Sequence, residues 1–229
     1  MKRVLILGGG FGGLATAHTL RELRPDDEVI VVDRETYFMV GFRKTWALLG
    51  MGSLDGGRGY LPNLEKFGIT FRHGTVMAID PETRTVEVDG ERLEADAIVV
   101  ALGARLADDE IPGFSDYALN VYDPMKIPQV REALQRFSGG RVVVGVFGLP
   151  YKCPPAPYEI ALLTKEFFAN RRVEATVEVF TPLPMTLPIV GTSGCDAIEG
   201  RLVSHGVTFL PNHTAVAVEE GEVIFQGGR

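Results

Sequence analysis

Residues 2–13 read KRVLILGGGFGG, an apolar run that ends in a cluster of glycines. The segment Lys2–Leu7 has the length and apolarity of a short buried β-strand. Apolar residues then recur at helical spacing between Gly13 and Leu23, and a proline follows. Glu28 to Val32 is a second apolar run, closed by Asp33. These residues predict a strand, a glycine turn, a helix and a second strand, in that order.

The glycines match the pattern G-x-G-x-x-G at Gly8, Gly10 and Gly13, with Asp33 twenty residues further on. In a chain with 27 glycines the pattern alone is weak, but its place between a strand and a helix makes it strong. Gly8 permits a tight turn, Gly10 lets backbone amides approach a pyrophosphate at the helix N-terminus, and Gly13 lets the helix pack on the strand. We predict a Rossmann βαβ unit whose adenine dinucleotide site comprises Gly8, Gly10, Phe11, Gly12, Gly13 and Asp33. The alternative is a glycine-rich turn without a ligand.

Composition excludes some classes of function and leaves others open. The chain has 229 residues, 45% of them apolar, and a net charge of −7, which gives no electrostatic reason to expect a nucleic-acid partner. No apolar run approaches the roughly 18 residues of a membrane span. The start MKRVLILGGG has a shorter apolar stretch than a signal peptide needs, and a buried strand explains it better. We expect a location in the cytoplasm or at the membrane periphery.

The middle of the chain predicts a small β-meander inserted as a crossover. Residues 37–60 are glycine-rich with weak periodicity and predict a loop with a short helix. Residues 69–88 resemble two strands around the turn Asp80-Pro81-Glu82-Thr83, a second turn falls at Gly90, and residues 97–101 form a further strand. Ile111-Pro112-Gly113 has the character of a boundary, so we expect domains at residues 1–113 and 114–229.

The second half predicts another βαβ-like unit. We expect strands at 141–147, 175–180 and 207–210, helices at 158–170 and 195–204, and a closing hairpin at 215–218 and 222–225. The fold class is therefore α/β, with two Rossmann-like lobes, the first of which contains a three-stranded meander.

Between strand and helix of this second unit lies the segment Tyr151-Lys152-Cys153-Pro154-Pro155-Ala156-Pro157-Tyr158-Glu159. Its prolines restrict the backbone after Cys153. The start of a helix and Lys152 would both favour the thiolate, the nucleophilic form of cysteine. Glu159 falls in the first helical turn, where a carboxylate is also favourable for the helix itself. The segment predicts an active cysteine; the alternative is a small buried apolar residue.

The chain resembles flavoproteins with two dinucleotide-binding domains, the class of glutathione reductase. That class has the meander and then a strand that ends beside the flavin, which Val99-Val100-Ala101-Leu102-Gly103 matches with Leu102 in place of the usual threonine. The resemblance implies FAD as cofactor, with Ala101, Leu102 and Gly103 near it and the Val76 backbone at the adenine. It also makes Arg34, Arg43 and Lys44 candidates near the phosphates, although ordinary surface charge is the simpler explanation for any one of them.

The cysteine segment resembles the K-C-x-P-A-P-Y-E signature of sulfide:quinone oxidoreductases and the flavoprotein subunit of flavocytochrome c sulfide dehydrogenase. The resemblance implies that Cys153 is a redox thiol, that Glu159 moves protons, and that electrons pass from sulfide through FAD to a quinone or a cytochrome. No second glycine fingerprint follows Phe147, and prolines occupy that place, which argues against NAD as the electron partner.

These families are longer than this chain, so we expect a fragment or a truncated product. Their second redox cysteine, the rest of the discontinuous FAD domain and any membrane contact would lie in the missing C-terminal part. Cys195 is placed at the start of a helix and is a weaker candidate for a second redox thiol, and the four histidines show no metal-ligand spacing. Two alternatives remain: an NADH:quinone-type flavin oxidoreductase and a non-catalytic FAD-binding fragment.

Overall fold

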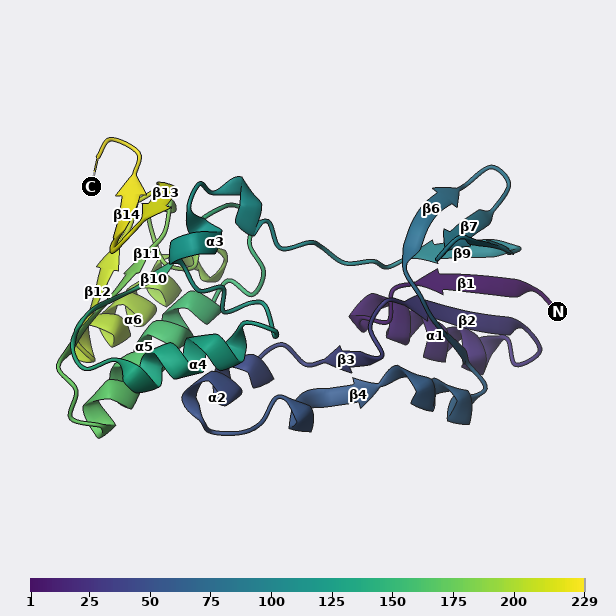
Figure 1. The fold of residues 1–229 in the computed structure, drawn as a ribbon, viewed down its shortest axis with the longest axis horizontal. Coiled ribbons are helices and arrows are strands. Elements are labelled where there is room, and N and C mark those ends of the chain that lie inside the picture. Colours follow the sequence, from purple (N-terminus) through teal and green to yellow (C-terminus); the bar gives the residue numbers. More distant parts are fainter. Residues whose placement is uncertain (229) are drawn as a thin grey trace. The chain divides into compact units, whose positions relative to one another are not determined.

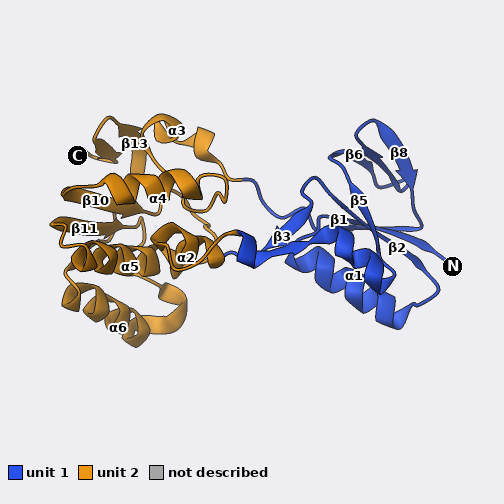
Figure 2. Cartoon of the chain, turned by 60° about the horizontal axis from the view of Figure 1, so that its bottom comes forward, with its two compact units in different colours: residues 1–41, 55–105 blue, residues 42–54, 106–229 orange. Residues whose placement is uncertain are grey.

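The computed structural model describes residues 1–228, which form two compact units. The first unit contains residues 1–41 and 55–105, and the second contains residues 42–54 and the chain from 106 onward (Figure 2). The expected boundary after Gly113 therefore differs from the observed one. Residues 106–113 associate with the second unit, where the Pro112 carbonyl accepts a hydrogen bond from the Val218 amide at 2.9 Å.

The first unit is built on a parallel sheet of strand order β5-β2-β1-β9 (Figure 1). Its strands are β1 (Arg3–Leu7), β2 (Glu28–Asp33), β5 (Thr70–His73) and β9 (Ala97–Val100). Alternate residues of β1 face opposite sides, as the pleat of a strand requires. Val4 and Ile6 pack with helix α1 (Phe11–Leu23), whereas Leu5 and Leu7 pack with residues of the meander. The sheet is thus buried on both faces, which explains the continuous apolar runs in the sequence.

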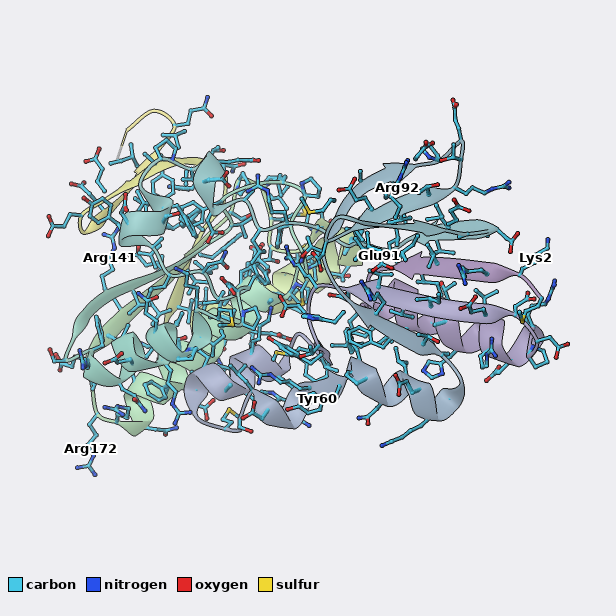
Figure 3. The ribbon with its side chains drawn as sticks, turned by 45° about the vertical axis from the view of Figure 1, so that its right-hand side comes forward. Lys2, Tyr60, Glu91, Arg92, Arg141 and Arg172 are labelled. Carbon is cyan, nitrogen blue, oxygen red and sulfur yellow. The ribbon has the colours of Figure 1, made fainter. Side chains whose placement is uncertain are left out.

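The predicted meander is present as an antiparallel sheet of β6 (Val76–Asp80), β7 (Thr85–Val88) and β8 (Glu91–Glu94). The Glu91 carboxylate at the start of β8 pairs with Arg72 on β5 at 2.5 Å and ties the meander to the main sheet (Figure 3 labels Glu91). A second small hairpin, β3 (Tyr37–Met39) with β4 (Arg58–Tyr60), was not predicted. Two 3₁₀ helices, η1 (Asp55–Gly57) and η2 (Leu61–Phe67), flank β4.

Helix α2 (Arg43–Leu49) is the short helix expected within residues 37–60, but it belongs to the second unit. Its Ala47 and Leu48 form a buried cluster with Ile127 and Val130 of α4 (Ile127–Arg136). Helix α4 was not among the elements predicted from the sequence. Its signal was nevertheless present, because Pro128 suits a first helical turn and Ile127, Val130 and Leu134 recur on one helical face.

The second unit has a parallel sheet of order β10-β11-β12, formed by β10 (Gly140–Gly145), β11 (Ala175–Phe180) and β12 (Val207–Leu210). Helices α5 (Ala156–Asn170) and α6 (Gly191–Ser204) pack on it through Tyr158, Ala161 and Leu202. The predicted closing hairpin is β13 (Ala215–Glu219) with β14 (Glu222–Phe225). The short elements are η3 (Asp108–Glu110), α3 (Phe114–Tyr117) and η4 (Pro188–Val190).

A cavity of about 1220 Å³ lies within the second unit, beside β10. Apolar side chains dominate its lining, among them Phe114, Val142, Val144, Phe147, Phe180 and Phe225. Among residues 1–228, the structure contains no helix with the length and apolarity needed to cross a bilayer.

Candidate functional site

The glycine turn between β1 and α1 contains glycines of two physically different kinds. Gly8 has a φ of +106°, and a Cβ there would lie 2.3 Å from the Ala101 carbonyl oxygen. A Cβ at Gly13 would lie 1.8 Å from the Gly8 carbonyl oxygen. Both positions need glycine for the fold itself, because such separations are far below van der Waals contact.

Gly10 is different, because nothing in the protein requires a glycine there. Its φ of −83° is open to any residue, and a Cβ at Gly10 would meet no atom within 4 Å. The missing side chain leaves open space directly at the start of α1. This open space is where a phosphate would approach the helix N-terminus in a dinucleotide-binding turn.

The first turn of α1 presents its amides to this space. Gly10 is the N-cap residue of α1 and has no side chain that could accept a hydrogen bond. The N–H groups of the first turn therefore receive no side-chain cap from this position. The positive end of the helix dipole favours an anion at the same point. Phe11, the first residue of α1, is 70% exposed and packs edge-on against Phe38 at 4.6 Å between ring centroids.

Asp33 at the end of β2 is held by backbone donors from both sides. Its Oδ2 accepts the Gly9 N–H at 2.6 Å, and its Oδ1 accepts the Glu35 N–H at 2.8 Å. Each carboxylate oxygen keeps a second lone pair, so the oriented group could still accept hydrogen bonds from ribose hydroxyls. The neighbouring Arg34 lies in the same unit, 4.0 Å from the Glu35 carboxylate.

The segment that follows β9 runs beside the glycine turn. The Ala101 N–H donates to the Leu7 carbonyl at 2.8 Å, Gly103 has a φ of +73°, and Leu102 is exposed. Carboxyl ends of parallel strands gather at one edge of a sheet, so the glycine turn, Asp33 and residues 101–103 share that edge. Val76 begins β6 in the same unit, and its adenine contact stays a prediction.

Cys153 lies in the second unit, on the loop that leads into α5. It is exposed and has a φ of +50°, the left-handed region in which a non-glycine residue is uncommon. Its carbonyl accepts the Ala156 N–H at 2.9 Å, which joins the loop to the first turn of the helix. Glu159 lies exposed in that turn, with its N–H donating to the Pro155 carbonyl at 3.1 Å.

Lys44 contacts residues of the second unit, which was not predicted from the sequence. It belongs to the second unit, whereas the glycine turn belongs to the first, and its ammonium donates to the Tyr122 carbonyl and lies 5.7 Å from the centre of the Tyr122 ring. The neighbouring Arg43 is in the same helix and stacks over Trp46 at 4.9 Å. A phosphate-binding role for either residue stays a prediction, which these contacts do not test.

Cys195 is not at a helix start. Helix α6 begins at Gly191, so Cys195 falls in the second turn, and it is 2% exposed. Cys195 is therefore better described as a buried packing residue than as a reactive thiol. Both cysteines are free thiols, and among residues 1–228 no group of His, Cys, Asp and Glu side chains is arranged to hold a metal ion.

The chain is similar to known proteins in both sequence and fold. Residues 2–228 match the family model of pyridine nucleotide-disulphide oxidoreductases. The chain is 28% identical over 237 residues to the sulfide-quinone reductase of Aquifex aeolicus, an alignment that covers 98% of this chain and 54% of that protein. A segment of 38 residues, 17% of this chain, is 50% identical to the sulfide dehydrogenase (flavocytochrome c) flavoprotein chain of Chlorobaculum thiosulfatiphilum and covers 79% of that sequence.

The crystal structure of the sulfide:quinone oxidoreductase of Aquifex aeolicus superposes with a TM-score of 0.90 at 25% identity, covering all of this chain and 56% of the other. The chain thus spans about half the length of the relatives it matches. The two-unit α/β fold, the glycine turn and a family match over residues 2–228 lead to one conclusion: this chain belongs to the pyridine nucleotide-disulphide oxidoreductase family.

Proposed function

We propose that the first unit binds FAD and that the protein oxidises sulfide, with Cys153 as the redox thiol. One observation carries the cysteine assignment: Cys153 is exposed, with a left-handed backbone, at the start of α5 in a segment that matches the sulfide dehydrogenase signature. The similarity to sulfide-quinone reductase over 98% of the chain supports the choice of substrate.

The residues of the first unit fit an adenine dinucleotide. The open space at Gly10 leaves room for the pyrophosphate at the α1 N-terminus, and Asp33, held by the Gly9 and Glu35 amides, would accept hydrogen bonds from a ribose. Gly8, Phe11, Gly12 and Gly13 complete the turn, Arg34 and Val76 would lie on the adenosine side, and Ala101, Leu102 and Gly103 would border the flavin. When bound, FAD supplies a two-electron acceptor.

The chemistry at Cys153 is thiol–disulfide exchange. Hydrosulfide attacks a disulfide that joins Cys153 to a second thiol, one S–S bond forms as another breaks, and the displaced sulfur leaves as a thiolate. The sulfur of the substrate would become persulfide sulfur, and the leaving thiolate would be the group that gives up two electrons when FAD is bound. Cys195 is a buried free thiol, so we do not assign it as the second cysteine of this disulfide.

Glu159 would handle the proton of this reaction. Its carboxylate is exposed in the first turn of α5, six residues after Cys153, and an ionised carboxylate accepts the proton that hydrogen sulfide releases. The electrons would then leave to a quinone or a cytochrome.

The test is anaerobic titration of the purified whole protein, loaded with FAD, with sulfide. We expect sulfide to bleach the oxidised flavin spectrum of the parent and of Cys195→Ser, and to leave Cys153→Ser unreduced. Bleaching of Cys153→Ser at the parent rate would exclude the cysteine assignment. Reduction by NADH but not by sulfide would favour an NADH:quinone-type oxidoreductase, and a protein that retains no flavin would favour a non-catalytic role.

A further inference from the structure

A series of hydrogen bonds joins helix α2 to the loop that carries Cys153. The Lys44 ammonium donates to the Tyr122 carbonyl, and the Tyr122 hydroxyl donates to the Lys152 carbonyl at 2.6 Å. Lys152 directly precedes Cys153, so the tyrosine holds the backbone of the cysteine loop. All four residues belong to the second unit.

Tyr122 is itself fixed from the opposite direction. Its N–H donates to Asn120 Oδ1 at 2.8 Å, and Asn120 Nδ2 donates to Asp108 Oδ1 at 2.5 Å. Burial raises the pKa of Tyr122 above its ordinary value of 10.0, so the phenol stays protonated and remains a donor. Tyr122 therefore connects η3, through Asn120, to the loop that carries Cys153 by hydrogen bonds.

Helix α2 presents Lys44 from a firmly docked position. Ala47 and Leu48 are buried against α4, and Arg131 Nη1 of α4 donates to the Ala47 carbonyl at 3.2 Å. The helix ends at Gly50, whose φ of +78° allows the Met51 N–H to return to the Trp46 carbonyl at 2.8 Å. With its last turn held in this way, α2 keeps Lys44 in one place.

The hydrogen bonds from Lys44 to Tyr122 and from Tyr122 to Lys152 link the Lys44 ammonium to the loop that carries Cys153. Burial, and then the charge of Lys152, lower the pKa of Lys44, while Asp123 and the cysteine itself act in the opposite direction. The charged and titratable groups that act on Lys44 are thus Lys152, Asp123 and Cys153, and the cysteine also acts on Tyr122 and Tyr151. A half-buried ammonium is screened less by water than a surface one, so its effect on a neighbouring thiolate is correspondingly larger.

We propose that Lys44 is a positioning residue for Cys153: it supplies a half-buried positive charge that favours the thiolate, and through Tyr122 it supports the backbone of the cysteine loop. The inference rests on the proposed role of Cys153 as the redox thiol. It assigns a role to the excursion of residues 42–54 into the second unit, which places a lysine from far upstream in the unit that contains Cys153.

The experiment measures alkylation of Cys153 by iodoacetamide in the purified chain, read on the Cys153 peptide by mass spectrometry across pH. Lys44→Met should slow alkylation near neutral pH by about three- to tenfold, the effect expected for the loss of one partly buried charge. The deficit should disappear at high pH, where the thiolate forms without help. Lys44→Arg should restore the parent rate, because it keeps the positive charge.

Lys126→Met is the matched control, since it removes an exposed lysine from the same unit, and it should alkylate as the parent does. Tyr122→Phe should speed amide hydrogen exchange in residues 152–154. The inference would be overturned if Cys153 in Lys44→Met were alkylated at the parent rate at every pH. It would also be overturned if Lys44→Met lost FAD affinity without a change in the alkylation rate. Neither result depends on sulfide turnover, so the inference and the proposed function fail separately.

Discussion

At the scale of single residues, the glycine turn separates positions that serve the fold from one that leaves room for a ligand. Gly13 could carry no side chain, because its Cβ would collide with the Gly8 carbonyl. Gly10 could carry one, since its backbone is ordinary and its surroundings are open. A glycine at such a position leaves the backbone open to the approach of a ligand.

Substitution should reveal this difference directly. Gly10→Val should leave the thermal midpoint close to the parent value and weaken FAD binding by at least about tenfold, because the side chain fills the space of the pyrophosphate. Gly13→Val should destabilise the first unit by about 3 kcal/mol or more through overpacking. Calorimetry together with flavin fluorescence quenching measures both. An unchanged FAD affinity in a folded Gly10→Val protein would remove the pyrophosphate from this position.

At the scale of elements, the turn between β6 and β7 shows how a local sequence fixes a strand pairing. Asp80 Oδ1 accepts the N–H groups of Glu82 at 3.0 Å and of Thr83 at 3.1 Å. This is the Asx-type turn that the residues Asp80-Pro81-Glu82-Thr83 predict. The hydrogen bonds from the Thr83 side chain and backbone lower the pKa of Asp80 below its ordinary value of 3.8.

The direction of that shift sets a pH dependence. A carboxyl whose pKa is lower in the folded state than in the unfolded state stabilises the folded protein at pH values above the unfolded-state pKa. This stabilisation is lost as the pH falls through the folded-state pKa. Asp80→Ala should therefore lower the thermal midpoint at pH 7, and the difference from the parent should shrink as pH falls below about 3.8. Glu82→Ala, an exposed change in the same turn, is the control. A difference that is independent of pH would mean that the Asp80 charge plays no part.

At the scale of the whole molecule, the chain contains two units, each with a parallel sheet and its own buried clusters. The proposed FAD residues lie in the first unit, and Cys153 with its supporting network lies in the second. A cofactor that binds one folded unit stabilises that unit through mass action.

Hydrogen exchange with and without FAD can therefore test the assignment to the first unit. At FAD concentrations near 100 times Kd the stabilisation should reach about 2.7 kcal/mol. We expect slower exchange at residues 9–13 and 101–103, with the core strands β10–β12 unchanged. Equal or greater protection of β10–β12 would place the adenine dinucleotide in the second unit. Protein incubated with AMP is a useful comparison, because it should protect only the adenosine side of the site.

Much of the fold follows from local sequence. Apolar runs bounded by turn residues placed β2, β11 and β12 within a residue or two, and the glycine pattern with Asp33 placed the βαβ unit. These features are encoded within a few residues of each other, as are the prolines that lead Cys153 into α5. For the same reason the sequence pointed to Cys153 and Glu159 as candidate residues.

Only the tertiary structure decided which distant segments meet. Nothing near Lys44 in the sequence indicates that its helix leaves the first unit to pack on α4, because that choice depends on the burial of Ala47 and Leu48 against residues some eighty positions away. The same long-range packing brings Tyr122 to the cysteine loop and buries Cys195 in the second turn of α6. The sequence by itself determined the elements and the glycine and cysteine motifs, while tertiary packing decided the neighbours of each reactive group, since contacts between distant segments leave no periodic signal along the chain.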